Sequence, residues 1–259
     1  MLQIKYNPRS KKGLALEVCV DSIQSAIAAE AGGAARVELC SSLAEGGITP
    51  GAGMIEVARK NISIGLHVLI RPRRGDFLYS SLELEIMKKD IEIAKATGAN
   101  GVVLGVLSKN GSIDTERMQE LIQISRPLSV TFHRAFDVCS DPFKALDDLI
   151  RLKVDRLLTS GQQASALQGA TLIRELVERA GNRLMVMPGG GISSKNIQEI
   201  IRKTKAKEFH SSAQKKVNSQ MGYQRKHLPM AGAKKLTEYE NLVADPARIM
   251  DIRKAGKLT

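Results

Sequence analysis

Eight short apolar segments recur along this chain, and the spacing between them leaves room for one helix each time. A strand that is apolar on both faces is typical of a parallel sheet covered by helices on both sides. The segments therefore predict a repeated βα unit, with strands at residues 14–20, 35–40, 65–71, 100–106, 128–133, 154–159, 183–187 and 206–210.

Helical patterns fill the intervals between these segments. Asp21, Asp114, Asp141 and Ser193 are residue types that commonly begin helices, and glycines such as Gly181 commonly end them. Seven helices are expected, near residues 21–31, 52–60, 81–97, 114–124, 142–151, 165–181 and 193–203.

The position of the glycine-rich run separates two arrangements of such a repeat. Gly189-Gly190-Gly191 follows the seventh strand, where barrels often bind phosphate, whereas open dinucleotide-binding sheets place this loop after the first strand. We therefore predict an α/β fold, a TIM-type (β/α)8 barrel with an irregular or incomplete last βα unit and a basic C-terminal extension.

The expected domain organisation is a basic arm at 1–13, a barrel at 14–212 and an extension at 213–259 that packs on the barrel or stays mobile. Residues 211–236 are expected to be irregular. Asp245-Pro246 is typical of a helix start and predicts a short terminal helix.

The net charge of +12 is concentrated at the two ends of the chain. The first 13 residues carry four basic side chains and no acid, and residues 211–259 carry ten Lys and Arg against four carboxylates. With no Trp to stack on bases, the chain is not expected to bind nucleic acid.

No apolar run is long enough for a membrane span, and the start of the chain does not resemble a signal peptide. We expect a cytoplasmic protein without a membrane partner, and a nuclear share stays open.

Two strand ends repeat a Glu-x-Cys pattern, which points both side chains to one face of the strand. Glu17 and Cys19 form the first pair, and Glu38 and Cys40 the second. His210 ends the eighth strand, which neighbours the first in a closed barrel. Two thiolates suit Cu(I), and two thiolates with an imidazole suit Zn(II). The competing interpretation is that both cysteines are small buried hydrophobic residues.

Guanidinium groups at other strand ends predict an anionic ligand. Arg71, Arg73 and Arg134 are the candidates, together with backbone N–H groups of Gly189, Gly190 and Gly191. These arginines, together with Arg74, are alternatively expected to neutralise Glu17, Glu38 and Glu208. If the site is catalytic, His133, Glu208 and His210 are the candidates for proton transfer.

Taken in order, the motifs of this sequence resemble the CutC copper-homeostasis family over about residues 14–212. Those motifs are Leu16-Glu17-Val18-Cys19-Val20-Asp21, Val37-Glu38-Leu39-Cys40-Ser41, Glu45-Gly46-Gly47-Ile48-Thr49-Pro50, Ile70-Arg71-Pro72-Arg73, Gly75-Asp76-Phe77-Leu78-Tyr79-Ser80, Thr131-Phe132-His133-Arg134-Ala135-Phe136-Asp137, Leu158-Thr159-Ser160-Gly161, Met187-Pro188-Gly189-Gly190-Gly191-Ile192 and Glu208-Phe209-His210-Ser211.

This resemblance implies a TIM-type barrel, a function in copper tolerance, Cu(I) ligation by Cys19 and Cys40, and assembly as a homo-oligomer, either dimer or tetramer. The chain departs from the family pattern at Arg74, where the family has glycine, and in the basic segment after residue 211. Two functions stay open. One is a Cu(I)-binding homeostasis protein with Glu17 and Glu38 beside the metal ligands. The other is an enzyme acting at the same barrel mouth on a small anionic metabolite, phosphorylated or not.

Overall fold

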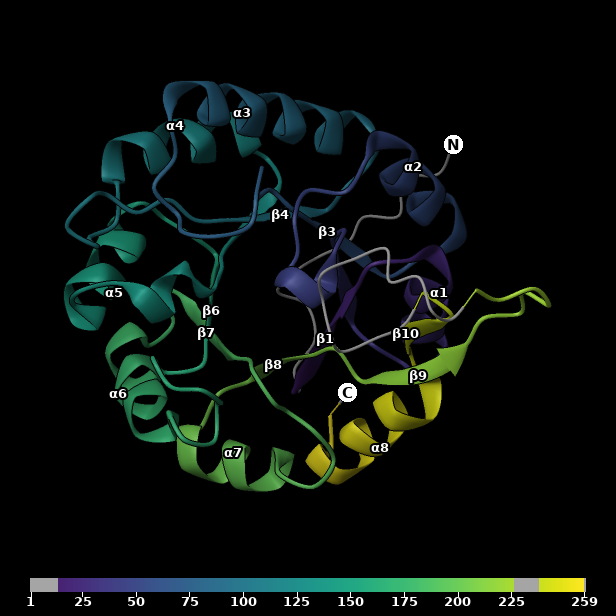
Figure 1. Cartoon of the computed structure of the whole chain (residues 1–259). Coiled ribbons are helices and arrows are strands. Elements are labelled where there is room, and N and C mark those ends of the chain that lie inside the picture. The colour runs from purple at the N-terminus through teal and green to yellow at the C-terminus, as the bar shows by residue number, and fades with distance from the viewer. Residues whose placement is uncertain (1–13, 226–237, 259) are drawn as a thin grey trace.

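A barrel of eight parallel strands forms the centre of the molecule (Figure 1). The computed structural model describes residues 14–225 and 238–258, so the basic arm at 1–13 and part of the segment expected to be irregular lie outside the described residues. The strands are β1 (Ala15–Val20), β2 (Arg36–Leu39), β3 (Gly65–Leu69), β4 (Gly101–Leu104), β5 (Ser129–Phe132), β6 (Arg156–Thr159), β7 (Met185–Pro188) and β8 (Glu208–Ser211).

The strands pair in chain order from β1 to β7, and β8 pairs with β1. A single parallel bridge between Gly189 and His210 joins β7 to β8 and closes the circle. All eight strands fall within one residue of the predicted segments or inside them, because their apolar side chains are buried between the barrel and its helices.

Eight helices surround the barrel in Figure 1: α1 (Ile23–Ala31), α2 (Ala52–Asn61), α3 (Ser81–Ala96), α4 (Thr115–Ser125), α5 (Pro142–Arg151), α6 (Ala170–Ala180), α7 (Ile197–Thr204) and α8 (Pro246–Gly256). The predicted TIM-type barrel is confirmed. No helix in the described ranges is both long and apolar enough to cross a bilayer.

Helix starts were predicted less well than the strands. Asp114, Asp141 and Asp245 cap their helices as expected. Ser22 caps α1 in place of Asp21, and α7 begins after Asn196 rather than at Ser193.

The predicted start of α6 at residue 165 was also wrong, because the helix begins at Ala170. Its preceding loop folds back so tightly that a Cβ on Gly169 would lie 2.0 Å from the carbonyl oxygen of Ser160. Only glycine permits this backbone approach, and the extended loop occupies the residues that were expected to be helical.

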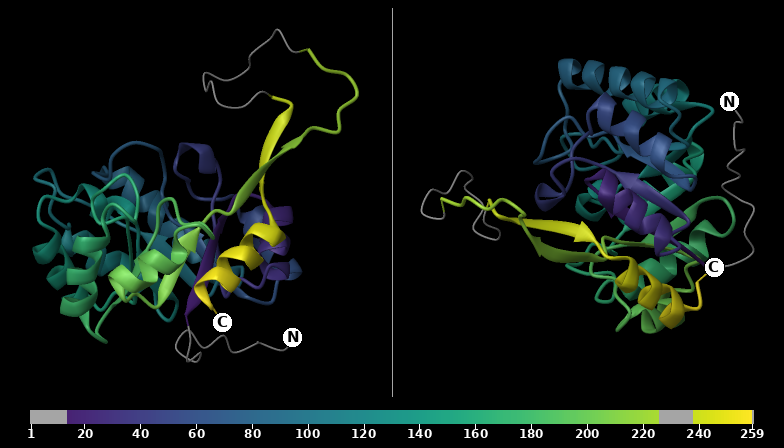
Figure 2. Two further views of the ribbon diagram at one scale, coloured as in Figure 1. Left: turned by 90° about the horizontal axis from the view of Figure 1, so that it is seen from below. Right: turned by 90° about the vertical axis from the view of Figure 1, so that its right-hand side faces the viewer.

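A two-stranded antiparallel ribbon interrupts the last βα unit, and it projects away from the barrel (Figure 2). It consists of β9 (Gln214–Asn218) and β10 (Glu240–Ala244). The expectation of irregular structure was wrong for 214–218. The sequence Gln-Lys-Lys-Val-Asn has no apolar alternation, and these residues are extended because they pair with a strand more than twenty residues later.

After the ribbon, the chain returns to the barrel through α8, which contacts both α7 and α1. The backbone N–H of Ala244 at the end of β10 donates to Ser25 Oγ on α1, at 3.1 Å. The ring of helices is thus completed by residues far along the chain from β8, with the ribbon inserted at the carboxyl ends of the strands.

Candidate functional site

The two strand-end cysteines lie side by side. Parallel pairing of β1 with β2 sets Cys19 opposite Glu38, and Cys40 follows one residue beyond β2, where its N–H donates to the carbonyl of Val20 at 2.9 Å. This stagger brings the sulfur atoms of Cys19 and Cys40 to 3.8 Å. The sequence predicted this proximity only if the strands were suitably staggered, and the register supplies that condition.

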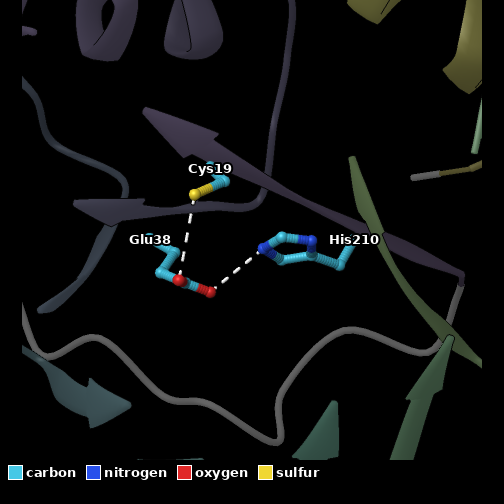
Figure 3. Close-up of side chains that lie close together, drawn as sticks. All are labelled: Cys19, Glu38 and His210. Atoms are coloured by element: carbon cyan, nitrogen blue, oxygen red, sulfur yellow. Dashed lines mark hydrogen bonds and ion pairs between the residues drawn. The ribbon is translucent and has the colours of Figure 1, made fainter. Parts of the chain in front are cut away.

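Glu38 links the thiol of Cys19 to the imidazole of His210 (Figure 3). The Cys19 thiol donates to Glu38 Oε1 at 3.8 Å, and His210 Nε2 lies 3.0 Å from Glu38 Oε2. One ligand atom from each of these three residues lies within 4.8 Å of the other two. The cluster therefore offers sulfur, oxygen and nitrogen donors, with the second sulfur of Cys40 adjacent.

Electrostatics in this cluster favour a neutral thiol beside an ion pair. The hydrogen bond with Cys40, burial and the charge of Glu38 together raise the pKa of Cys19 well above its ordinary value. Burial opposes ionisation of Glu38, but the His210 cation outweighs it and lowers the pKa of Glu38. Burial likewise opposes the His210 cation, yet the Glu38 carboxylate raises the pKa of His210.

Cys40 is sealed from solvent. Its side chain is fully buried, and its thiol donates to the carbonyl of Val20 at 3.5 Å. Gly47, in the loop after β2, covers it so closely that a Cβ there would lie 3.4 Å from the Cys40 sulfur. Cys19, in contrast, lines the cavity at the barrel mouth.

That cavity has a volume of about 780 Å³ and opens among the carboxyl ends of the strands. Of the predicted site residues, it is lined by Cys19, Glu38, Arg71, His133, Arg134, Gly190, Gly191 and His210. Lys195, Ser211, Ser212, Gln214 and Arg248 also line it. Ser211 ends β8, and the sequence did not single out the others because they belong to loops, the ribbon and α8, whose positions no local pattern reveals.

Two of the predicted arginines are fixed at this cavity. Arg71 donates to the carbonyls of Gly47 and Gly75, both at 2.9 Å, and its guanidinium stacks 5.1 Å above the ring of Phe77. Arg134 pairs with Asp137 at 2.7 Å and with Ser160 Oγ at 2.9 Å. Both side chains are positioned without using all their donors, as an anion site requires.

His133 faces the cavity as a neutral hydrogen-bond donor. Its Nδ1 accepts the N–H of Ala135 at 3.2 Å, so the proton of the neutral ring lies on Nε2. Burial lowers the pKa of His133 to about 4. Nε2 is buried and has no hydrogen-bond partner among the described residues.

Other predicted site residues lie away from the cavity. Arg73 pairs with Asp76 and Glu83 on the far side of its loop. Gly189 makes the bridge to β8, and Glu208 lies deeper in the barrel. Glu17 is buried beneath the cluster, with its Oε1 3.8 Å from His210 Nε2.

Glu17 and Glu208 belong to a buried layer of ion pairs. The arginines expected to neutralise them were those at the strand ends, but the partners are Arg36 and Arg156. Arg36 bonds both carboxylates, and Arg156 bonds Glu208 at 2.7 Å and Ser129 Oγ at 2.7 Å. The sequence spacing could have identified Arg36 as a partner. Arg36 precedes Glu38 by two residues and Cys40 by four, so its side chain points to the same face of β2.

Comparison with known proteins identifies the family of this chain. The model of the CutC family matches residues 14–215. The chain belongs to the CutC family. A human relative named copper homeostasis protein cutC homolog is 47% identical over 245 residues, which cover 95% of this chain and 90% of the human protein. A family protein CutC from Parabacteroides distasonis is 49% identical over 235 residues, covering 90% and 97% of the two chains.

Solved structures extend the comparison to the fold. A CutC family structure from Streptococcus agalactiae, described as a putative copper homeostasis protein, superposes with a TM-score of 0.74 at 37% identity and covers 77% of this chain and 98% of its own. Phosphoribosylanthranilate isomerase from Thermotoga maritima gives a TM-score of 0.56 at 12% identity, covering 94% of this chain and 98% of its own. The likeness to phosphoribosylanthranilate isomerase concerns the barrel fold alone.

Proposed function

We propose that this CutC family member serves copper homeostasis by binding Cu(I) through the thiolates of Cys19 and Cys40, with Glu38 and His210 beside the metal. The observation that carries the proposal is the 3.8 Å separation of the two sulfur atoms. A metal–sulfur bond of about 2.3 Å, as in zinc thiolates, sets two tetrahedral ligands roughly 3.8 Å apart. The sulfur pair therefore accommodates a tetrahedral ion as it stands, whereas two-coordinate Cu(I), whose ligands lie in line with the metal, needs the sulfurs roughly 4.6 Å apart.

The choice of Cu(I) over Zn(II) rests on ligand type and on the relatives. Thiolates are soft ligands that select Cu(I), and two of them are enough for it. The human relative and the streptococcal structure both carry copper-homeostasis names. The His210 imidazole and the Glu38 carboxylate complete a donor set that suits Zn(II) as well, so Zn(II) is the competing ion.

An anaerobic titration of the reduced protein with Cu(I), against a calibrated competing chelator, tests this proposal. We expect about one copper per chain, because the two sulfurs form one site. Cys19→Ser and Cys40→Ser should each weaken binding by at least about 100-fold, or about 2.8 kcal/mol.

Cys139→Ser is the matched control. Cys139 is also buried and free, but its sulfur contacts Gln162 on the β6 side of the barrel. Copper affinity that stays the same in both strand-end variants, or that falls only in the Cys139 variant, would remove the proposed site. A parallel titration with Zn(II) shows which ion the wild-type chain prefers.

A second candidate function, an enzyme acting on a small anionic metabolite, phosphorylated or not, is favoured by the cavity. Its volume of about 780 Å³ falls in the range of about 300–1,000 Å³ for small-molecule sites and far exceeds the space of one ion. Arg71, Arg134, Gly190 and Gly191 would bind the anion, with His133 and His210 as the groups that transfer protons. Arg73 and Glu208 do not line the cavity, so this second candidate function assigns them no role.

A further inference from the structure

The cavity at the barrel mouth is strongly basic. Arg71, Arg134, Lys195 and Arg248 line it, and Glu38 is the one carboxylate among the described lining residues. Arg134 is paired with Asp137, whereas the other three form no ion pair with any carboxylate in the described part of the chain. Glu38 is itself engaged by His210. The excess positive charge is therefore unbalanced and favours an anionic occupant.

A buried donor points to the same kind of occupant. His133 is 6% exposed and lines the cavity, and its Nε2 has no hydrogen-bond partner among the described residues. A buried donor without a partner costs about 1–3 kcal/mol. Nε2 is itself closed to solvent, so a ligand acceptor atom would recover that cost only if neighbouring side chains moved.

The floor of this basic cavity is a copper ligand of the proposed site. Cys19 lines the cavity but is only 4% exposed, and behind it lies the fully buried sulfur of Cys40. A metal ion that reaches the sulfur pair must pass through a space of small-molecule size. The volume of about 780 Å³ is that of a small-molecule site.

We infer that Cu(I) is delivered to this site as a complex with a small anionic thiol, whose carboxylates are held by the basic groups of the cavity. This inference rests on the proposed Cu(I) site. A thiol carrier keeps copper in the +1 state, and its size and charge match the volume and the excess positive charge described above.

The transfer is a ligand exchange that balances without an oxidant or a reductant. The Cys19 sulfur forms a bond to Cu(I) as one carrier sulfur leaves, and the Cys19 proton passes to the departing carrier thiolate. Cys40 repeats the exchange with the second carrier sulfur. Copper remains Cu(I) throughout, and no electron is transferred.

Two carriers that share one thiol peptide but differ in carboxylate charge test this inference. Reduced protein is mixed anaerobically with Cu(I) complexed either by glutathione, which has two carboxylates, or by glutathione diethyl ester, which has none. Samples are desalted rapidly at set times, and copper per chain is measured by atomic absorption. Loading from glutathione should be about 10-fold faster, at the low end of electrostatic steering, and 0.5 M salt should shrink the difference.

Lys195→Gln combined with Arg248→Gln should abolish most of this preference, because both side chains line the cavity and neither is paired with a carboxylate among the described residues. Lys207→Gln is the matched control, because this exposed lysine immediately precedes β8 and so lies at the opposite end of the barrel. Equal loading rates from the two carriers, or a preference that survives in the double variant, would overturn the inference.

The equilibrium Cu(I) titration distinguishes failure of the delivery step from failure of the copper site itself. A wild-type chain that binds Cu(I) tightly from the chelator but shows no carrier preference leaves the copper site in place and removes only the delivery step. A chain that binds no Cu(I) removes both. Saturable binding of metal-free inorganic phosphate in the cavity, with no effect of glutathione on loading, would overturn the inference and favour the second candidate function.

Discussion

At the scale of single residues, His133 combines burial with a fixed tautomer. Burial lowers the pKa of His133 to about 4. The Glu38 carboxylate favours the cation but is outweighed, and the Arg71 cation adds to the lowering. An unfolded histidine titrates near pH 6.5. Between these values the unfolded chain binds a proton that the folded chain does not, so folding stability falls as pH falls.

We therefore predict that His133→Gln flattens the pH dependence of stability between about pH 6.5 and about pH 4. In that window His133 lowers the free energy of unfolding by up to about 1.4 kcal/mol for each pH unit of acidification. Urea unfolding at several pH values gives the slope for the wild type and the variant. Slopes rather than absolute stabilities are compared, because the substitution also changes packing.

His67 and His210 also contribute to the pH dependence of stability, in the wild type and in the His133 variant alike. His67, whose pKa is lowered well below its ordinary value by burial and then by Arg36 and Arg156, adds to the loss on acidification. His210, whose pKa is raised, contributes stability that is fully present below pH 6.5 and is lost as pH rises. Identical slopes in the wild type and the His133 variant would show that His133 is protonated in the folded chain.

The sequence predicted the strand-end residues better than their partners. Cys19, Cys40, Glu38 and His210 come together because their strands are neighbours, which the order of the strands already implies. The pairing of each carboxylate was not predictable in this way, because it depends on depth along the barrel axis. Arg36 lies two residues deeper than Glu38 on the same face, and so reaches Glu17 and Glu208.

At the scale of elements, the loop after β2 forms the cover of Cys40. Gly47 has φ +83°, a conformation that suits glycine, and a Cβ there would lie 2.7 Å from Leu69 Cδ2 and 3.3 Å from the Cys40 Cβ. The loop therefore holds its shape through a residue that has no side chain.

We predict opposite effects for two Gly→Ala substitutions close together in the sequence. Gly47→Ala should destabilise the chain by about 1–3 kcal/mol and weaken Cu(I) binding, because the new methyl group strains the backbone and presses on Leu69 and Cys40. Gly53→Ala should stabilise it by about 0.5–1 kcal/mol, since Gly53 lies in α2 with open space around it.

Urea unfolding and the copper titration check both variants. A Gly47→Ala protein with wild-type stability would show that the loop does not press on the cysteine. The Gly53 variant should bind copper as the wild type does, because α2 does not line the cavity.

Elements with their own repeating pattern were the predictable ones. The eight strands and the aspartate-capped helices follow from local apolar runs and helix caps. The ribbon did not, because β9 is polar and its partner β10 is distant in sequence. The late starts of α6 and α7 depend on loop packing at Gly169 and on the Ser193 N–H donating to Asn196, which periodicity does not record.

At the scale of the whole molecule, a buried layer of charge joins distant parts of the chain. Arg36 on β2 bonds Glu17 on β1 and Glu208 on β8, and Arg156 on β6 bonds Glu208 as well. Burial opposes ionisation of Glu208, but Arg36 and Arg156 outweigh it and lower its pKa. Removing one cation leaves carboxylates buried without compensation.

Arg36→Met should therefore lower the free energy of unfolding by about 3–5 kcal/mol. Arg174→Met is the control, because Arg174 pairs with Glu178 on the outer surface of α6, and an exposed pair of this kind is worth about 0.3–0.5 kcal/mol. Urea unfolding of both variants at neutral pH gives the comparison. Equal, small losses would mean that water reaches the buried layer and takes over from the arginine.

The same layer lies beneath the sulfur pair, and the cavity lies above it. Among the described residues Val20 and Gly47 enclose Cys40 while Cys19 lines the cavity, so a metal ion bound as proposed would reach solvent past Cys19. Whatever enters by this route must leave by it. A protein built in this way is suited to hold an ion and return it on demand, as a reservoir does, rather than to pass it from one side of the barrel to the other.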